Sequence, residues 1–222
     1  MSVFVKICGL TSEKDVEAVV RLKPDAIGFV FWAKSKRHVT ADAVGAWAGL
    51  IPGTIQKVGV FADAAMDEVL ETVRIARLDV VQLHFFQSLE NAPENFPIIG
   101  KLHEDFSNHW KNPPRLWQVL HLRKGVKAGP VSEHVDAVLI DSYSADLPGG
   151  TGHVGDWVRA RDFVERSAKP VLLAGGLTRA NIQEALRAVR PWGVDVSSGV
   201  ELSPGKKDLS KVKDFIELCR SA

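Results

Sequence analysis

Residues 3–9, VFVKICG, decide the fold class. The stretch is short and rich in apolar and β-branched residues, which predicts a strand that ends at Cys8. Because successive side chains of a strand point to opposite faces, Lys6 and Cys8 share one face, while Val5 and Ile7 share the other. Polar groups on one face of a strand, near its carboxyl end, are typical of a closed α/β barrel with a ligand at its mouth.

Three later stretches show the same kind of pattern. Gln82 and His84 share a face at the end of one predicted strand, and Asp195 and Ser197 share a face in the last one. Asp141 ends another predicted strand. An open sheet with helices on both faces would be more uniformly apolar. The pattern therefore favours a barrel whose polar groups gather at one mouth.

Short apolar runs alternate with longer amphipathic stretches along the chain, as expected for repeated βαβ units. The predicted strands are residues 3–8, 26–32, 57–61, 80–84, 137–141, 170–174 and 193–198. The predicted helices are residues 13–22, 41–50, 66–76, 157–167, 180–189 and 209–219. Ser12 and Thr40 place hydroxyl groups where helix N-caps are expected.

The fifth strand has two candidates. Residues 98–102 and 116–122 both qualify, and we favour the second because it is longer and richer in apolar residues. Residues 85–115 then form an irregular connection, in which four prolines would break any long helix. Either choice gives eight strands, and no linker-like tract divides the chain. We therefore predict that residues 1–222 form a single (β/α)8 TIM barrel of the α/β class.

Composition excludes several other classes of protein. The 222 residues carry 28 Lys+Arg and 27 Asp+Glu, a net charge of +1, so a broad nucleic-acid surface is not expected. Two cysteines make no disulfide framework, which favours a reducing, cytoplasmic location. No run of about 18 apolar residues is present, and no signal peptide is visible, so we expect no membrane partner.

Two residues at strand ends are candidates for proton transfer. Cys8 is either a small packing residue or a proton acceptor whose pKa is lowered by a cationic neighbour such as Lys6. Asp141 is either a turn former or a general acid that burial keeps protonated near neutral pH.

Several loops are candidates for ligand binding. Gly175-Gly176 and Ser198-Gly199 each precede a predicted helix start, where backbone N–H groups favour an anion such as phosphate. The loop around Gly150 is either a plain turn or a mobile lid. No metal-ligand spacing appears, so we expect neither a metal nor a cofactor.

Arg37 lies in the basic run 35–38, SKRH, which follows the second predicted strand. Such a run is usually a solvated loop. At the mouth of a barrel, however, the two-pronged guanidinium of Arg37 would bind a carboxylate.

Together these motifs resemble the N-(5'-phosphoribosyl)anthranilate isomerase family, over essentially the whole chain. Each motif is weak alone, but their order is specific. The motifs are 5–11 (VKICGLT), 28–31 (GFVF) with 35–37 (SKR), 58–61 (VGVF), 81–84 (VQLH), 139–142 (LIDS), 149–152 (GGTG), 173–177 (LAGGL) and 194–201 (VDVSSGVE).

The resemblance implies a cofactor-free Amadori rearrangement of N-(5-phosphoribosyl)anthranilate to 1-(2-carboxyphenylamino)-1-deoxyribulose 5-phosphate, a step of tryptophan biosynthesis. The family's general base and general acid map onto Cys8 and Asp141. Its carboxylate-binding arginine maps onto Arg37. The only partner implied is this small molecule, and the chain would be a monomer or a homodimer. The expected substrate-binding residues are Arg37, Gly175, Gly176, Asp195, Ser197, Ser198 and Gly199, with Lys6, Gln82, His84 and Gly150 as further candidates.

Two features differ from the family pattern. The family usually continues Leu-His-Gly-x-Glu where this chain has 83–87, LHFFQ. The family's usual lysine in strand five is either supplied by Lys101 or has His121 standing near its place. The alternatives are a histidine-pathway or dual-substrate isomerase of the same chemistry and a non-catalytic phosphate-binding barrel. The first class carries aspartate at the position of Cys8, and the Cys8/Asp141 pair disfavours the second.

Overall fold

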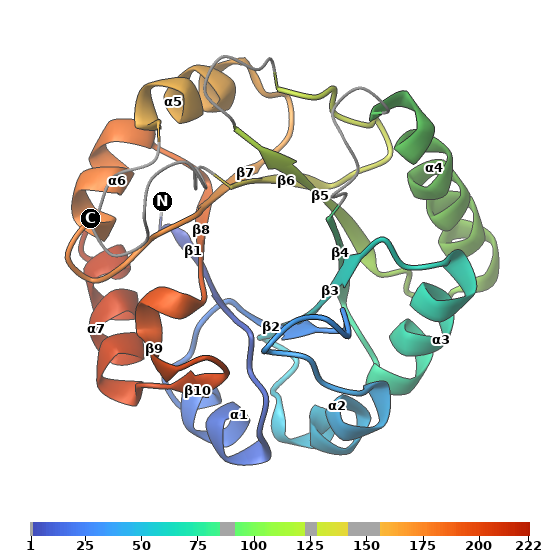
Figure 1. Ribbon diagram of the computed structural model, residues 1–222, viewed down its shortest axis with the longest axis horizontal. Coiled ribbons are helices and arrows are strands. Elements are labelled where there is room, and N and C mark those ends of the chain that lie inside the picture. The colour runs from blue at the N-terminus through green and yellow to red at the C-terminus, as the bar shows by residue number, and fades with distance from the viewer. Residues whose placement is uncertain (1, 85–91, 123–127, 142–155) are drawn as a thin grey trace.

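The strands of the chain close into a barrel. In the computed structural model, which describes residues 2–84, 92–122, 128–141 and 156–222, eight parallel strands pair in sequence order and β1 also pairs with β8. Figure 1 shows this ring of strands surrounded by helices. The strands are β1 (Phe4–Cys8), β2 (Ala26–Val30), β3 (Gln56–Ala62), β4 (Val80–His84), β5 (Arg115–His121), β6 (Ala137–Asp141), β7 (Val171–Ala174) and β8 (Gly193–Val196).

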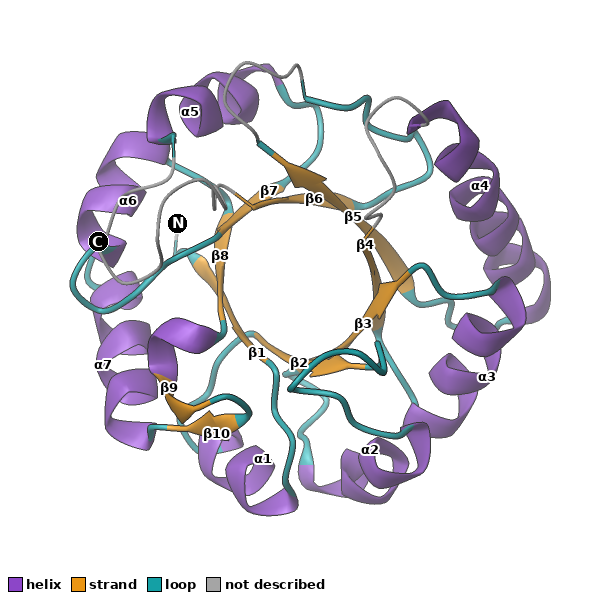
Figure 2. Ribbon diagram, in the orientation of Figure 1, coloured by secondary structure: helices purple, strands orange, loops and turns teal. Residues whose placement is uncertain are grey.

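The helices lie outside the strands, as Figure 2 shows. Ser12 and Thr40 cap α1 and α2, because their hydroxyl oxygens accept hydrogen bonds from backbone N–H groups in the first helical turn. The α-helices are α1 (Glu13–Val20), α2 (Ala41–Trp47), α3 (Met66–Ala76), α4 (Ala92–His109), α5 (Trp157–Arg166), α6 (Ile182–Val189) and α7 (Leu209–Arg220), and the 3-10 helices are η1 (Ala48–Leu50) and η3 (Ser198–Val200). None of the helices in the described ranges is both long and apolar enough to cross a membrane.

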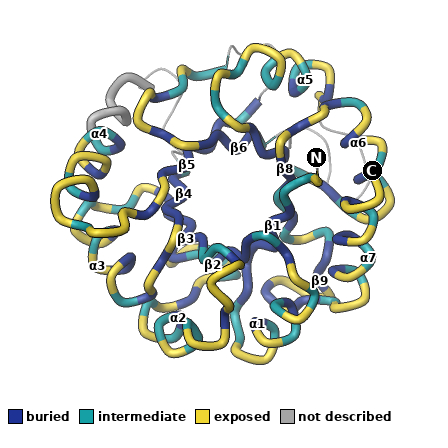
Figure 3. Tube along the Cα trace, turned by 180° about the vertical axis from the view of Figure 1, so that it is seen from behind, coloured by how far each residue is buried: buried dark blue, intermediate teal, exposed yellow. Residues whose placement is uncertain are grey.

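The buried residues form two layers, and Figure 3 shows the buried strands inside exposed outer helix surfaces. Val5 and Ile7 belong to the large layer between strands and helices. A smaller layer around Trp117 fills the barrel interior. Lys6 and Cys8 face the other way from Val5, toward the interior, so the predicted alternation is confirmed.

The structure decides between the two candidates for the fifth strand and corrects the prediction for the connection before it. β5 lies at the favoured position, and residues 98–102 belong to α4. The prediction that prolines exclude a long helix from 85–115 was wrong, because α4 has 18 residues. Pro93 lies in its first turn, where backbone N–H groups have no partner within the helix, whereas Pro97 lies within the helix and cannot donate a hydrogen bond there.

A short hairpin that was not predicted from the sequence follows β8. Its strands are β9 (Glu201–Ser203) and β10 (Lys206–Lys207), which pair antiparallel. Gly205 adopts a positive φ of 85° in the turn between them. Figure 1 shows the hairpin beside α1 and α7, on the outer side of the ring.

Candidate active site

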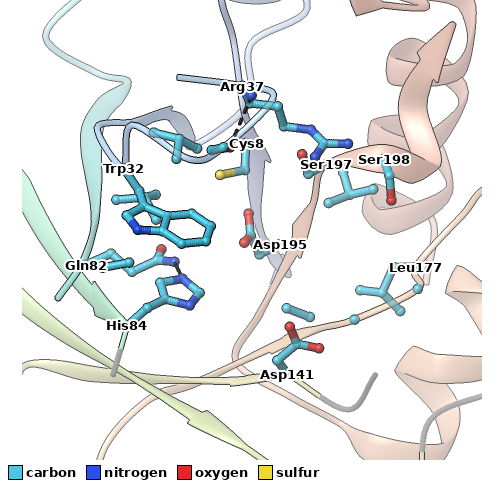
Figure 4. Close-up of a pocket in the computed structure, with 18 residues that line it drawn as sticks. Cys8, Trp32, Arg37, Gln82, His84, Asp141, Leu177, Asp195, Ser197 and Ser198 are labelled. Atoms are coloured by element: carbon cyan, nitrogen blue, oxygen red, sulfur yellow. Dashed lines mark hydrogen bonds between the residues drawn. The ribbon is translucent and has the colours of Figure 1, made fainter. Parts of the chain in front are cut away.

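A cavity of about 410 Å³ opens at the carboxyl ends of the barrel strands. It is of the size of small-molecule sites, which range from about 300 to 1,000 Å³. Figure 4 shows its polar side chains converging from strands on different sides of the barrel. The predicted site residues among those lining it are Cys8, Arg37, Gln82, His84, Asp141, Gly175, Gly176, Asp195, Ser197 and Ser198.

Cys8 has a buried charged residue beneath it. The Lys6 side chain is fully buried, and its Nζ donates a hydrogen bond to Asp195 Oδ1 at 2.9 Å. The strand register places Lys6 opposite Asp195 on β8 and Cys8 opposite Gly28 on β2. Lys6 is therefore held between the thiol and the Asp195 carboxylate and is not itself among the residues lining the cavity.

These neighbours set the acidity of Cys8. Burial raises the pKa of the Cys8 thiol, and the Lys6 ammonium opposes part of that shift. Burial alone would lower the pKa of Lys6, but the Asp195 carboxylate and Cys8 outweigh it, so that the pKa of Lys6 is raised. The raised pKa of Cys8 is the reverse of the predicted lowering, because burial outweighs the Lys6 ammonium. Lys6 itself remains an ammonium, and it would stabilise the thiolate that forms when Cys8 loses its proton.

Asp141 ends β6 and faces the cavity beside a pair of histidines. The register pairs it with His121 at the end of β5, and His121 Nδ1 lies 4.0 Å from Asp141 Oδ2. The ring of His84 lies 6.0 Å from that of His121, centroid to centroid, and His84 Nε2 is 3.0 Å from Gln82 Nε2. Burial and then the adjacent His121 lower the pKa of His84 to about 3, so His84 is neutral at pH 7.

Arg37 reaches the cavity from the loop after β2. Its Nε and Nη2 donate to the two carboxylate oxygens of Glu201 at 2.8 and 2.6 Å. This contact uses the side edge of the guanidinium, and the end edge, made by Nη1 and the second N–H of Nη2, is the one that remains for a ligand carboxylate. Gly9 makes room for Arg37, since a Cβ there would lie 2.6 Å from Arg37 Cδ.

The loops after β7 and β8 form one side of the cavity. Gly175 and Gly176 have positive φ angles of 89° and 66°, so this loop depends on glycine. Ser197 Oγ is buried and has no hydrogen-bond partner among the described residues. Gly199 is not among the residues lining the cavity, but a Cβ on it would overlap the carbonyl oxygen of Leu177, so it allows the two loops to touch.

One predicted part of the site cannot be compared with this geometry, and three residues at or near the site were not predicted. Gly150 and the 149–152 loop lie outside the described residues. Glu201, which ends the 194–201 motif, Lys207 and Trp32 also contribute to the site or its surroundings, and none of them was predicted as a site residue from the sequence. Within the described ranges, no group of three or more His, Cys, Asp or Glu side chains is arranged to hold a metal ion.

Comparison with known proteins identifies the family of the chain. Residues 5–218 match the family described as N-(5'phosphoribosyl)anthranilate (PRA) isomerase. The chain is 37% identical over 219 residues to N-(5'-phosphoribosyl)anthranilate isomerase of Trichlorobacter lovleyi, covering 98% of each chain. It is 38% identical over 222 residues to that of Geobacter metallireducens, again covering 98% of each.

Solved structures give the same result. The structure of phosphoribosyl anthranilate isomerase from Thermotoga maritima superposes with a TM-score of 0.80 and 29% identity, over 99% of this chain and 100% of that one. A phosphoribosyl anthranilate isomerase solved with reduced 1-(o-carboxyphenylamino)-1-deoxyribulose 5-phosphate superposes with a TM-score of 0.77 and 28% identity, at the same coverage. The chain therefore belongs to the N-(5'-phosphoribosyl)anthranilate isomerase family.

Proposed function

We propose that this chain converts N-(5-phosphoribosyl)anthranilate into 1-(2-carboxyphenylamino)-1-deoxyribulose 5-phosphate, with Cys8 as the general base and Asp141 as the general acid. The observation that carries the assignment is that both side chains line one cavity, from β1 and β6, in a member of this family. All 222 residues would serve this one catalytic barrel. With both cysteines free, we place the activity in a reducing cytoplasm.

The reaction needs one proton donor and one proton acceptor. Asp141 would protonate the furanose ring oxygen, so that the ring opens to an iminium ion. The iminium makes the proton on C2′ acidic, and the Cys8 thiolate would remove it to give an enolamine. The enolamine then tautomerises to the aminoketone. General acid–base assistance contributes about 10²- to 10⁴-fold per group, so substrate positioning must supply much of the remaining rate enhancement.

Two anchors at the cavity would position the substrate. The end edge of Arg37 would bind the anthranilate carboxylate. Backbone N–H groups around Gly175, Gly176 and Ser198, with the hydroxyl of Ser197, would bind the phosphate. Neutral His84 would act as a hydrogen-bonding group of the pocket wall and not as a cation.

Activity of the purified chain on two substrates tests this proposal. We expect conversion of N-(5-phosphoribosyl)anthranilate, followed as a change in anthranilate fluorescence. We expect at most about 1% of that kcat/KM with the histidine-pathway aminoaldose, which undergoes the same rearrangement. A substrate that leaves polar groups of the site without a hydrogen-bond partner is strongly disfavoured. Absence of conversion of the first substrate, or equal conversion of both, would contradict the proposal.

A further inference from the structure

The β9–β10 hairpin places a buried ion cluster directly behind Arg37. The Glu201 carboxylate accepts hydrogen bonds from both Nε and Nη2 of Arg37 and from Lys207 Nζ, the last at 2.9 Å. The backbone N–H of Gly205 donates to the same carboxylate at 3.3 Å. Of these groups Arg37 lines the cavity, whereas the side chains of Glu201 and Lys207 are 4% and 0% exposed.

The cluster leaves a positive charge at the cavity. An Arg37–Glu201 pair alone would be neutral and would attract a ligand carboxylate only weakly. Lys207 adds a second cation: burial lowers its pKa, but the hydrogen bond to the Glu201 carboxylate and its negative charge oppose that shift. The three residues together therefore carry one positive charge at the cavity edge. Burial alone would raise the pKa of Glu201, but the hydrogen bonds from Arg37 and Lys207 hold it below its usual value, so Glu201 is ionised at pH 7.

The hairpin also connects the loops that follow the neighbouring strands β1 and β8. Thr11 Oγ1 donates to the carbonyl oxygen of Gly205 at 2.6 Å, and the Lys207 backbone N–H donates to Asp15 Oδ2 at 3.1 Å, so the hairpin is fixed to the loop after β1 and to α1. Lys207 Nζ also donates to the Ser197 carbonyl oxygen at 3.3 Å, in the loop proposed to bind phosphate. These bonds give Glu201 a rigid support.

We propose that Glu201 and Lys207 are positioning residues for Arg37, which turn the end edge of its guanidinium toward the carboxylate of an aromatic substrate and leave the Arg37–Glu201–Lys207 cluster with a net positive charge. Figure 4 shows the Arg37 side chain extending past Cys8 toward Ser197. The proposal rests on the role of Arg37 given under the proposed function. It specifies that the hairpin determines recognition of the carboxylate and not the proton transfers.

Glu201→Gln tests the proposal because it keeps the shape of the side chain and removes its charge. We expect the KM for the anthranilate substrate, and the Kd of a reduced, carboxylate-bearing product analogue, to rise about ten- to hundredfold, as a displaced anchoring group would produce. We expect kcat to stay within about threefold and the Kd of ribose 5-phosphate to stay unchanged, because neither depends on this carboxylate contact. In Arg37→Ala the same Glu201→Gln change should have no further effect on KM.

Two further variants and a matched control complete the test. Lys207→Met should weaken the binding of the carboxylate-bearing product analogue. Lys207→Arg, which keeps the charge, should retain at least half of the affinity that Lys207→Met loses, on a logarithmic scale. Lys207→Met decides the test if Glu201→Gln does not fold by circular dichroism. Asp214→Asn breaks a comparable but exposed pair with Arg179, 3.0 Å apart, and should leave every constant unchanged.

The outcomes separate this proposal from the one on which it rests. If Arg37→Ala leaves KM unchanged, Arg37 does not bind the carboxylate, and both statements about Arg37 fail while the isomerase assay itself still stands. If Arg37→Ala raises KM but Glu201→Gln does not, the positioning role of Glu201 is wrong. An equal loss of affinity for ribose 5-phosphate and for the product analogue would also overturn it, because the hairpin would then only support the fold.

Discussion

Replacing Gly28 by alanine should damage the site although no proposed catalytic residue is itself replaced. Gly28 lies on β2 directly opposite Cys8, and its carbonyl oxygen accepts hydrogen bonds from the N–H groups of Gly9 and Leu10. A Cβ at Gly28 would lie 2.7 Å from the Cys8 sulfur and 3.1 Å from Cε and Nζ of Lys6. The absence of a Cβ at Gly28 therefore leaves room for the Cys8 thiol.

The size of the effect follows from these distances. Ordinary contacts between heavy atoms lie at about 3.5–4.0 Å, so the sulfur would have to move by about 1 Å. Lys6 has nowhere to move, because it is fully buried and bound to Asp195. Overpacking of this kind costs about 1–3 kcal/mol of stability, and a misplacement of about 1 Å in a reacting group costs about 10²-fold in rate.

Steady-state fluorescence kinetics and thermal unfolding measure both effects. We expect Gly28→Ala to lower kcat by about 10²-fold, with a much smaller change in KM and a modest fall in Tm. Gly49→Ala is the matched control, because a Cβ there meets no atom within 4 Å, and it should behave as the unmodified chain. A folded Gly28→Ala variant with kcat within about twofold of the unmodified chain would refute the reasoning, since the thiol would then tolerate displacement.

Three more changes have predicted outcomes. Lys6→Met removes the cation that opposes the raised pKa of Cys8, so that pKa should rise further, and the ascending limb of kcat/KM, which needs the thiolate, should move to higher pH; a pH profile checks this. Arg37→Ala should raise the KM for the anthranilate substrate with little change in kcat, as measured by steady-state kinetics. Gly199→Ala should push the loops after β7 and β8 apart and weaken inhibition by inorganic phosphate, as measured by competition assays.

The barrel could be predicted because the signals for it are local. The alternation of Lys6 and Cys8 with Val5 depends only on the two-residue period of a strand, and the structure keeps it. The polar ends of the strands were likewise visible, because parallel strands of a barrel bring their carboxyl ends to one mouth. The cavity accordingly gathers Cys8, Asp141 and Asp195 from three different strands.

The features that were missed depend on distant partners or on position within an element. Glu201 pairs with Arg37 from 164 residues away, and nothing in the sequence around either residue indicates that pair. Lys207 would pass for an exposed lysine until the hairpin buries it. The four prolines of 85–115 predicted a broken connection, but the effect of a proline depends on where the helix begins, and Pro93 falls in the first turn of α4.

The turnover of Cys8→Ala and Asp141→Asn, beside that of the unmodified chain, tests the central claim most directly. Each variant should lose isomerase activity by at least about 10²-fold in kcat, because each lacks one of the two proton-transferring groups. Each should still bind the reduced product analogue and unfold at nearly the unmodified Tm. Near-normal turnover in either folded variant would contradict the assignment of Cys8 as the base or Asp141 as the acid.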